Sequence, residues 1–215
     1  MADFATLRRS MVDGQVRTAD VTDRPLIQAM LDVPRERFVP ADQRELSYLD
    51  LGLVVGEGRR LLKPMVLAKM IQALELAVDQ RVLDVGCTTG YAAALLSRLC
   101  NSVVALEEQP ALASQARANL SGIGNVEVIE GALAAGHVAG APYDAILVEG
   151  AVEFQPDSLC RQLSEGGRLV CILGVGPAAK ATLYRRDGAD ISRHAIFDAA
   201  GVVLPGFAKP AAFAF

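Results

Sequence analysis

The residues of this chain that are best suited to chemistry lie between positions 82 and 108. The run VLDVGCTTGY predicts a buried strand that ends near Asp84, a turn with Gly86 and Gly90, and then a helix. Glycine lets the backbone turn sharply and approach a ligand closely, and a helix start offers unpaired N–H groups. The next predicted strand ends at Glu107, where an acid can accept hydrogen bonds from both hydroxyls of a ribose. This order of elements predicts a site for an adenosine-type cofactor.

The spacing of the glycines in the turn indicates which adenosine-type cofactor would bind. A dinucleotide requires a GxGxxG turn for its pyrophosphate, whereas Thr88 stands between the two glycines here. Asp84 would repel phosphates but attract the ammonium group of a sulfonium amino acid. A nicotinamide oxidoreductase is therefore disfavoured, and S-adenosylmethionine is predicted, with S-adenosylhomocysteine as the product. The glycines alone would also fit an ordinary strand–turn–helix, so the two acids carry the prediction. The expected cofactor contacts are Asp84, Gly86, Cys87, Thr88, Thr89, Gly90, Tyr91, Glu107 and Glu108.

The composition narrows the class of protein. A chain of 215 residues with 52% apolar and 21% charged residues can build one domain with a sizeable core. The net charge of -4 argues against a nucleic-acid-binding protein, which usually has a basic face. Four cysteines without a CxxC pair and two histidines without ligand-like spacing predict neither disulfides nor a metal site. The sequence has no signal-like start and no apolar run of about 18 residues, so we expect a cytoplasmic protein without a membrane partner.

The segment before the cofactor turn predicts small helices and an irregular stretch. Apolar residues at helical spacing over positions 4–11 predict a first helix. Asp23 is a suitable cap for a second helix, with Pro25 in its first turn, and this helix should end before Pro34. Residues 51–55 predict a short strand, and the run GEGRR at 56–60 predicts a flexible, basic loop.

The remaining elements predict an α/β core. A helix should begin at Pro64 and place Val78 on its apolar side. Apolar runs alternating with helical patterns predict a mostly parallel sheet with helices on both faces. The later runs TLYRR and ISRHAIF, joined by Asp187-Gly188, predict an antiparallel hairpin. The expected strands are 81–85, 102–107, 126–130, 144–148 and 168–173.

These segments resemble the protein-L-isoaspartate (D-aspartate) O-methyltransferase family. Residues 33–40 match its VPR-x-x-FVP signature, and 54–70 match its substrate segment, usually GxGQTISQPxxVAxM. The runs PYDAILVEGA at 142–151 and LSEGGRLVCILG at 163–174 match its fourth and fifth strands. The resemblance implies a Rossmann-like class I methyltransferase with a seven-stranded-type sheet, an N-terminal helical extension and a C-terminal hairpin. It also implies methyl transfer to isoaspartyl carboxylates of damaged proteins, which begins their repair.

The chain departs from the family pattern where substrate and adenine should bind. Leu62 replaces the family serine, Arg60 its threonine and Lys63 its glutamine, while Glu149 begins the run that is usually Thr-Ala-Ala. The family's GDG is Gly131-Ala132-Leu133 here, so the aspartate that bonds the adenine amino group is absent. By resemblance, the run 131–133 and Val148 complete the cofactor site. The expected substrate and catalytic positions are Leu62, Lys63, Arg60 and Glu149.

Methyl transfer to a carboxylate does not require a strong general base among these residues. The carboxylate is already ionised at pH 7, so catalysis is mostly placement and exclusion of water. We hypothesise that Lys63 or Arg60 attracts the substrate carboxylate in place of the missing hydroxyl; the alternative is a solvated basic loop without a role. Glu149 either orients a substrate amine or backbone, or caps the following helix.

Three functions stay open at this point: an isoaspartyl methyltransferase, an S-adenosylmethionine-dependent enzyme with another acceptor, and a catalytically impaired relative that binds the cofactor. Residues 1–62 should form a lead-in and substrate loop packed on a core of residues 63–215. The expected partners are damaged proteins or peptides, without nucleic acid. We expect a monomer or a weak homo-oligomer, with an apolar tail at 206–215 that either packs on the core or self-associates.

Overall fold

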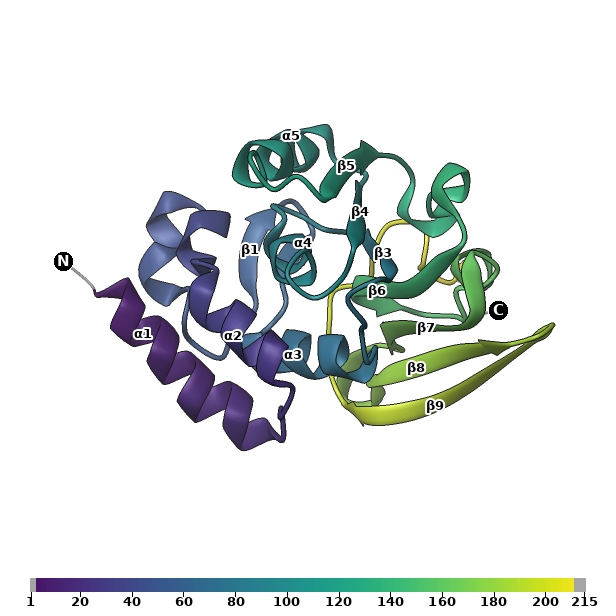
Figure 1. Cartoon of the computed structure of the whole chain (residues 1–215), viewed down its shortest axis with the longest axis horizontal. Coiled ribbons are helices and arrows are strands. Elements are labelled where there is room, and N and C mark those ends of the chain that lie inside the picture. Colours follow the sequence, from purple (N-terminus) through teal and green to yellow (C-terminus); the bar gives the residue numbers. More distant parts are fainter. Residues whose placement is uncertain (1–2, 211–215) are drawn as a thin grey trace, which may run out of the picture.

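The computed structural model describes residues 3–210, and its centre is one seven-stranded sheet in the order β5-β4-β3-β6-β7-β8-β9 (Figure 1). The strands from β5 to β7 are mutually parallel, while β8 and β9 continue the sheet as antiparallel neighbours. The α/β fold predicted from the sequence is therefore confirmed. The strands are β3 (Arg81–Val85), β4 (Ser102–Glu107), β5 (Val126–Glu130), β6 (Tyr143–Val152), β7 (Leu163–Leu173), β8 (Lys180–Asp187) and β9 (Asp190–Asp198).

Alternate residues of the central strands enter two separate apolar cores. On β3, Val82 packs with the N-terminal helices, whereas Leu83 and Val85 pack on the opposite face with Leu133 and Leu204. This alternation follows from the period of two in a strand and explains why these strands are apolar almost throughout. The expectation of a sheet that is covered on both faces is confirmed. The helices are α1 (Phe4–Met11), α2 (Arg24–Asp32), α3 (Pro64–Ala73), α4 (Tyr91–Leu96), α5 (Pro110–Asn119) and α6 (Asp157–Cys160).

The N-terminal helices begin where the sequence predicts. Asp3 caps α1, and the Asp23 side chain accepts a hydrogen bond from the Leu26 N–H at the start of α2. A π-helical turn (Val12–Val16) and a 3₁₀ turn (Arg17–Ala19) join these two helices. Two further 3₁₀ turns (Arg35–Phe38 and Ala41–Leu46) then lead to the first strand. In Figure 1 this lead-in lies beside α3 and α4, at one side of the sheet.

The segment at 56–60 expected to be a flexible basic loop instead forms the tip and the adjoining strand ends of a β-hairpin, so this prediction is wrong. Strand β1 (Leu53–Gly56) pairs antiparallel with β2 (Arg59–Leu61). Arg59 and Leu61 point inwards and are buried, whereas Arg60 between them is exposed. The expectation for Val78 is also wrong. Helix α3 ends at Ala73, and Val78 lies in the following loop with 82% of its surface exposed.

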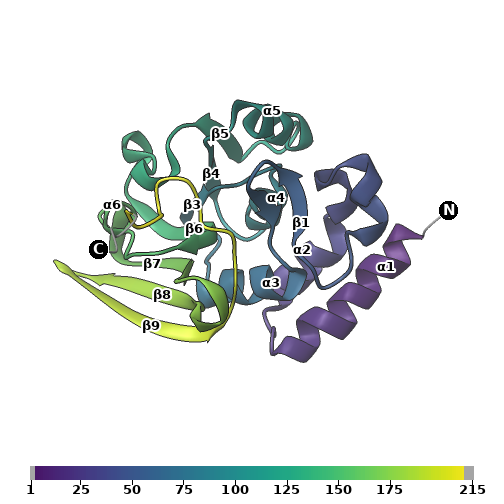
Figure 2. The same cartoon turned by 180° about the vertical axis from the view of Figure 1, so that it is seen from behind.

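The segment after β9 returns across the carboxyl ends of the parallel strands. Figure 2 shows it, in yellow, rising from the end of β9 and passing over β6 and β3. Ala151 of β6 binds it on both sides, donating to the Val202 carbonyl (2.8 Å) and accepting from the Leu204 N–H (3.0 Å). Gly206 and Phe207 of the predicted apolar tail belong to this segment, and Phe207 is buried on the core. The last five residues of that tail lie outside the described residues.

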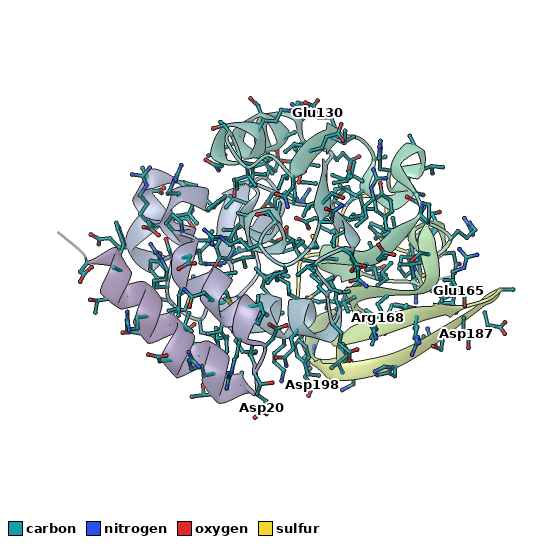
Figure 3. All side chains as sticks on the ribbon, viewed as in Figure 1. Asp20, Glu130, Glu165, Arg168, Asp187 and Asp198 are labelled. Carbon is teal, nitrogen blue, oxygen red and sulfur yellow. The ribbon has the colours of Figure 1, made fainter. Side chains whose placement is uncertain are left out.

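Most charged side chains lie on the periphery, as Figure 3 shows for Asp20 in the turn before α2 and for Glu130, Glu165, Asp187 and Asp198 on four different strands. Three carboxylic acids are exceptions, because Asp84, Glu107 and Glu149 are at least 98% buried. Burying a carboxylate is costly unless a partner compensates it.

None of the helices within residues 3–210 has the length and apolar character that crossing a membrane requires.

Candidate active site at the carboxyl ends of the parallel strands

The glycine turn after β3 has the sharp geometry that its sequence predicts. Gly86 and Gly90 have positive φ angles of 81° and 94°, which favour glycine because it has no Cβ. Thr88 also has a positive φ, of 52°. A left-handed conformation costs a β-branched residue about 1–2 kcal/mol, so the turn contains a strained residue between its two glycines. Its backbone N–H donates to the Glu107 Oε2 at 2.9 Å, which ties the turn to the end of β4.

Glu107 forms a buried ion pair that the sequence does not reveal. The Arg59 Nη1 of β2 lies 2.7 Å from the Glu107 Oε1, and both side chains are at most 1% exposed. The same Oε1 accepts the backbone N–H groups of Glu108 and Gln109, at 3.0 Å each. The second guanidinium nitrogen of Arg59, Nη2, donates to the Gly86 carbonyl at 2.8 Å. Arg59 therefore connects the acid of β4 to the turn of β3.

The β1–β2 hairpin is held over this turn by a second contact. The Gln109 side-chain amide, at the start of α5, donates to the Glu57 carbonyl at the hairpin tip (2.9 Å). A Cβ added to Gly56 would lie 3.1 Å from the Leu112 side chain, so the hairpin packs closely on α5. The hairpin thus covers the junction of β4 and α5, where Glu107 lies.

Asp84 and Glu149 form a second buried acidic group, between β3 and β6. None of their four carboxyl oxygens has a hydrogen-bond partner among the described residues. Burial raises the pKa of Asp84 to about 7. Burial and the neighbouring Asp84 carboxyl also raise the pKa of Glu149 well above its ordinary value. The pair therefore holds at least one proton near neutral pH. Glu149 lies within strand β6, which continues to Val152, and the next helix begins only at Asp157, so the alternative that Glu149 caps a following helix is wrong.

The polar side chains just after Gly86 contact the N-terminal lead-in. Thr89 Oγ1 donates to the Phe38 carbonyl at 2.6 Å, and the rings of Phe38 and Tyr91 meet edge-on with centroids 5.5 Å apart. The Arg35 guanidinium stacks over Tyr91 and donates to the Leu62 carbonyl at 2.8 Å. Through these contacts the VPR-x-x-FVP run connects the glycine turn to the substrate segment.

Cys87, in the same turn, is fully buried. Burial, followed by the nearby Asp84 carboxyl, raises the pKa of its thiol well above the ordinary value. The thiol therefore stays protonated and serves as a small filler of the turn. All four cysteines of the chain are buried free thiols.

The other residues predicted to bind the adenosine part of the cofactor are buried and apolar, exposed to solvent, or bound to the backbone. Leu133 is buried in the second core, and together with Leu204 it lies within 4 Å of the position that a Cβ on Gly86 would take. Gly131 donates its N–H to the Glu107 carbonyl, while Ala132 and the Glu108 side chain are exposed. Val148 is buried and paired with Val85.

A pocket beside the hairpin brings together the residues predicted for the substrate. It contains about 450 Å³ of empty space, including part that is open to solvent. Arg60, Leu62, Lys63 and Glu149 all line it. The Arg60 Nη1 donates to the Gly52 carbonyl at 3.2 Å, and the Lys63 Nζ lies 3.6 Å from the Asp50 Oδ2. The pocket wall is completed by Gly52, Gly58, Leu61 and, from the C-terminal segment, Ala200, Gly201, Val202 and Leu204.

Sequence reasoning missed Arg59 and Leu204. Arg59 stands where the family pattern GxGQTISQ has its first glutamine, and this substitution of a charge was the available signal. The alternation of buried, exposed and buried residues over Arg59–Leu61 was too short to indicate a strand. Leu204 had no signal, because its contact with the glycine turn depends on how the chain returns after β9.

Comparisons with known proteins indicate the family of this chain. The family model for protein-L-isoaspartate(D-aspartate) O-methyltransferase (PCMT) matches residues 8–201. A protein-L-isoaspartate O-methyltransferase of Roseiflexus sp. (strain RS-1) is 40% identical over 206 residues, which are 95% of this chain and 94% of the relative. A solved structure of a protein-L-isoaspartate O-methyltransferase superposes with a TM-score of 0.82 at 25% identity, over 93% of this chain and 66% of that one.

A second solved structure supports the fold. It is from Plasmodium falciparum, is described as a beta-aspartate methyltransferase (PCMT), and is in complex with S-adenosyl-L-homocysteine. It superposes with a TM-score of 0.75 at 20% identity, over 95% of this chain and 99% of that one. The sequence match over residues 8–201 and the relative of nearly equal length lead to one conclusion: this chain belongs to the protein-L-isoaspartate(D-aspartate) O-methyltransferase family.

Proposed function

We propose that this chain is an S-adenosylmethionine-dependent O-methyltransferase that acts on isoaspartyl carboxylates of damaged proteins. The observation that carries the proposal is the family match over residues 8–201, which includes both strand-end acids and the substrate segment. Relatives at about 40% identity bear the same enzyme name over most of their length.

The buried acids indicate how well the residues of the site fit S-adenosylmethionine. The four carboxyl oxygens of Asp84 and Glu149, which have no partner in the described part of the chain, suit the ammonium group of a methionine moiety, because a bound cation would compensate both acids. Glu107 suits a ribose, but Arg59 already occupies one of its oxygens. The adenine would meet the apolar Leu133 and no aspartate. The residues therefore fit the amino-acid end directly, and the ribose end once Arg59 has left Glu107.

The pocket beside the hairpin is the proposed substrate site. When it is bound, S-adenosylmethionine supplies an electrophilic methyl group. The protein's task is then to bring a carboxylate to that methyl and to exclude water. Glu149 lines the pocket and also neighbours the Asp84 carboxyl, so it lies at the boundary between the two sites. Arg60 and Lys63 supply positive charge at the mouth for the incoming carboxylate.

A methylation assay tests this function. The chain should transfer a methyl group to an isoaspartyl peptide and leave the matched aspartyl peptide at background. An Asp84→Asn variant is the matched control for the cofactor site and should lower the transfer. Equal, background-level signal from both peptides would contradict the proposal, and methylation of the aspartyl peptide alone would indicate a different acceptor.

Removing the basic side chains at the pocket should weaken substrate capture. The double variant R60A/K63A should raise the KM for an isoaspartyl peptide by about 5- to 30-fold, on the scale of one or two exposed charge contacts of about 1–2 kcal/mol in total, and lower kcat less. Steady-state kinetics at low and high salt would measure the change, with R44A on the exposed surface as the control. An unchanged KM at low salt would show that the two cations have no role in binding.

Three further expectations from the sequence stay predictions. A cytoplasmic location is compatible with four buried free thiols. The division into a lead-in at residues 1–62 packed on a core at 63–215 stays a prediction, which is supported by the contacts of Thr89 with Phe38 and of Arg35 with Tyr91. A monomer or weak homo-oligomer stays the expected state in solution.

A further inference from the structure

Arg59 occupies the place where a ribose would bind. In this fold the acid that ends the second parallel strand receives the ribose hydroxyls of a nucleotide. The corresponding acid here is Glu107, and its four hydrogen bonds are already made. Oε1 accepts from Arg59 and from two backbone N–H groups, while Oε2 accepts from the Thr88 N–H. Three of these donors belong to the turns that form the site, so Arg59 is the one that a ligand could replace.

The same guanidinium also covers the glycine turn. Its Nη2 bonds the Gly86 carbonyl, and a Cβ added to Gly86 would lie only 2.8 Å from this nitrogen. Gly86 is the position at which the turn leaves room for a ligand, since it has no side chain of its own. The space in front of the turn is thus filled by a side chain from another part of the protein. Leu204 and Leu133 are the next nearest side chains, at 3.3 Å and 3.7 Å from the same Cβ position.

Arg59 is carried by an element that is attached at its two ends. The β1–β2 hairpin is bound at its tip through Glu57 and Gln109, and its base continues into Leu62, whose carbonyl is held by Arg35. The pair with Glu107 is the buried contact between these two attachments. The Arg59 Nε is buried without a hydrogen-bond partner among the described residues. The cation is therefore incompletely satisfied in this position, which favours its exchange for another ligand of Glu107.

We propose that Arg59 is an autoinhibitory side chain: it fills the ribose subsite in the closed protein, and the cofactor binds only after Arg59 leaves Glu107. This inference rests on the proposed function, because it assumes that the site takes S-adenosylmethionine. The ligand binds the open form alone, so its apparent affinity falls by the fraction of protein that is open. A minor form populated at about 0.1–10% corresponds to a loss of about 10- to 1,000-fold.

Removal of the guanidinium should increase cofactor affinity. In R59Q the side chain is neutral, shorter, and of the type that the family pattern has at this position. We expect R59Q to bind S-adenosylhomocysteine at least about tenfold more tightly than the wild-type chain in calorimetric titration. The matched control is R98Q, which removes an arginine whose ion pair with Asp32 lies on the surface. Its affinity should stay within about twofold of the wild-type value, as expected for a distant site.

The outcomes separate this inference from the proposed function. Equal binding by the wild-type chain and R59Q would overturn the autoinhibitory role and leave the cofactor site standing. An absence of heat from both proteins at millimolar ligand would overturn the inference and the proposed function together. Tighter binding by R59Q, with or without measurable wild-type binding, supports the inference.

A measurement on the wild-type chain keeps the inference testable if R59Q does not fold. Because the opening of Arg59 must precede binding, the observed association rate should reach a plateau as ligand concentration rises. A fluorescent S-adenosylhomocysteine analogue in stopped flow would report this rate. A rate that rises linearly over the whole concentration range would show that the site is already open and would overturn the proposal.

Discussion

Replacing Glu107 by alanine is expected to lower the free energy of unfolding by about 3–5 kcal/mol. The substitution leaves the Arg59 guanidinium buried without a counter-charge, and breaking one side of a buried ion pair has a cost of about this size. It also removes the acceptor of three backbone N–H groups, those of Thr88, Glu108 and Gln109. For a chain of this size the melting temperature should fall by about 6–20 °C, which calorimetry or circular dichroism would measure.

The loss of stability caused by E107A should depend on whether Arg59 is present. In the double variant R59M/E107A the buried cation is gone, so the double variant should be more stable than E107A alone. The neighbouring Glu108 is exposed, and E108A is the matched control, with an expected change within about 0.5 kcal/mol. If E107A unfolded within about 1 kcal/mol of the wild-type chain, Arg59 and Glu107 would not form the buried pair.

Replacing Glu149 by glutamine is expected to stabilise the ligand-free protein at pH 8 by about 1–3 kcal/mol, with a much smaller effect at pH 5. Glu149 and Asp84 are buried together, and within residues 3–210 their carboxyl oxygens have no hydrogen-bond partner. Their carboxyl pKa values are raised in the folded protein, that of Asp84 to about 7. Glutamine has a similar shape, carries no charge, and can donate a hydrogen bond to Asp84.

The direction of the pH effect follows from proton linkage. Above the ordinary pKa values of about 4 the unfolded chain releases the protons of both acids, while the raised pKa values let the folded chain retain protons to higher pH, for Asp84 to about pH 7. Stability from these groups is therefore fully present below the ordinary pKa of about 4 and is lost as the pH rises through the raised folded values. The E149Q variant no longer has the pH-dependent loss of stability that Glu149 causes. The difference in free energy of unfolding between E149Q and the wild-type chain should therefore grow with pH.

Thermal unfolding from pH 5 to pH 8 would measure this difference. The exposed Glu45 provides the matched control, because E45Q changes the same side chain on the surface. The melting temperatures of E45Q and the wild-type chain should follow the same pH dependence. An E149Q profile parallel to the wild-type profile would contradict the view that Glu149 is a buried acid with a raised pKa.

The sequence alone predicted the sheet and the glycine turn. The central strands are apolar almost throughout because both faces are covered, and this pattern is local, so it can be read without the structure. The bounds of β3 and β4 agree with the prediction, whereas β6 and β7 are longer than expected. Their extra residues include Glu149 and Gly150, which are polar or small and carry no strand signal of their own.

The hairpin and the two acidic groups required the tertiary structure. Arg59 reads as a residue of a solvated basic loop because its partner, Glu107, lies 48 positions later in the chain. Similarly, Asp84 and Glu149 are 65 positions apart (149 minus 84), and no local pattern indicates that β3 and β6 are neighbours. Charge pairing and burial depend on which segments the fold brings together, so they are not visible in a run of residues.

The stretch from Val82 to Glu108 determined the fold and the kind of cofactor site, because strand, turn, helix and acid follow each other directly in the sequence. The tertiary structure decided what those residues contact in the closed protein. It placed Arg59 on Glu107 and Glu149 beside Asp84, through a hairpin from before the core and a strand from after it. Local patterns specify elements through short-range sterics and hydrophobic periodicity, whereas the occupancy of a site depends on long-range packing.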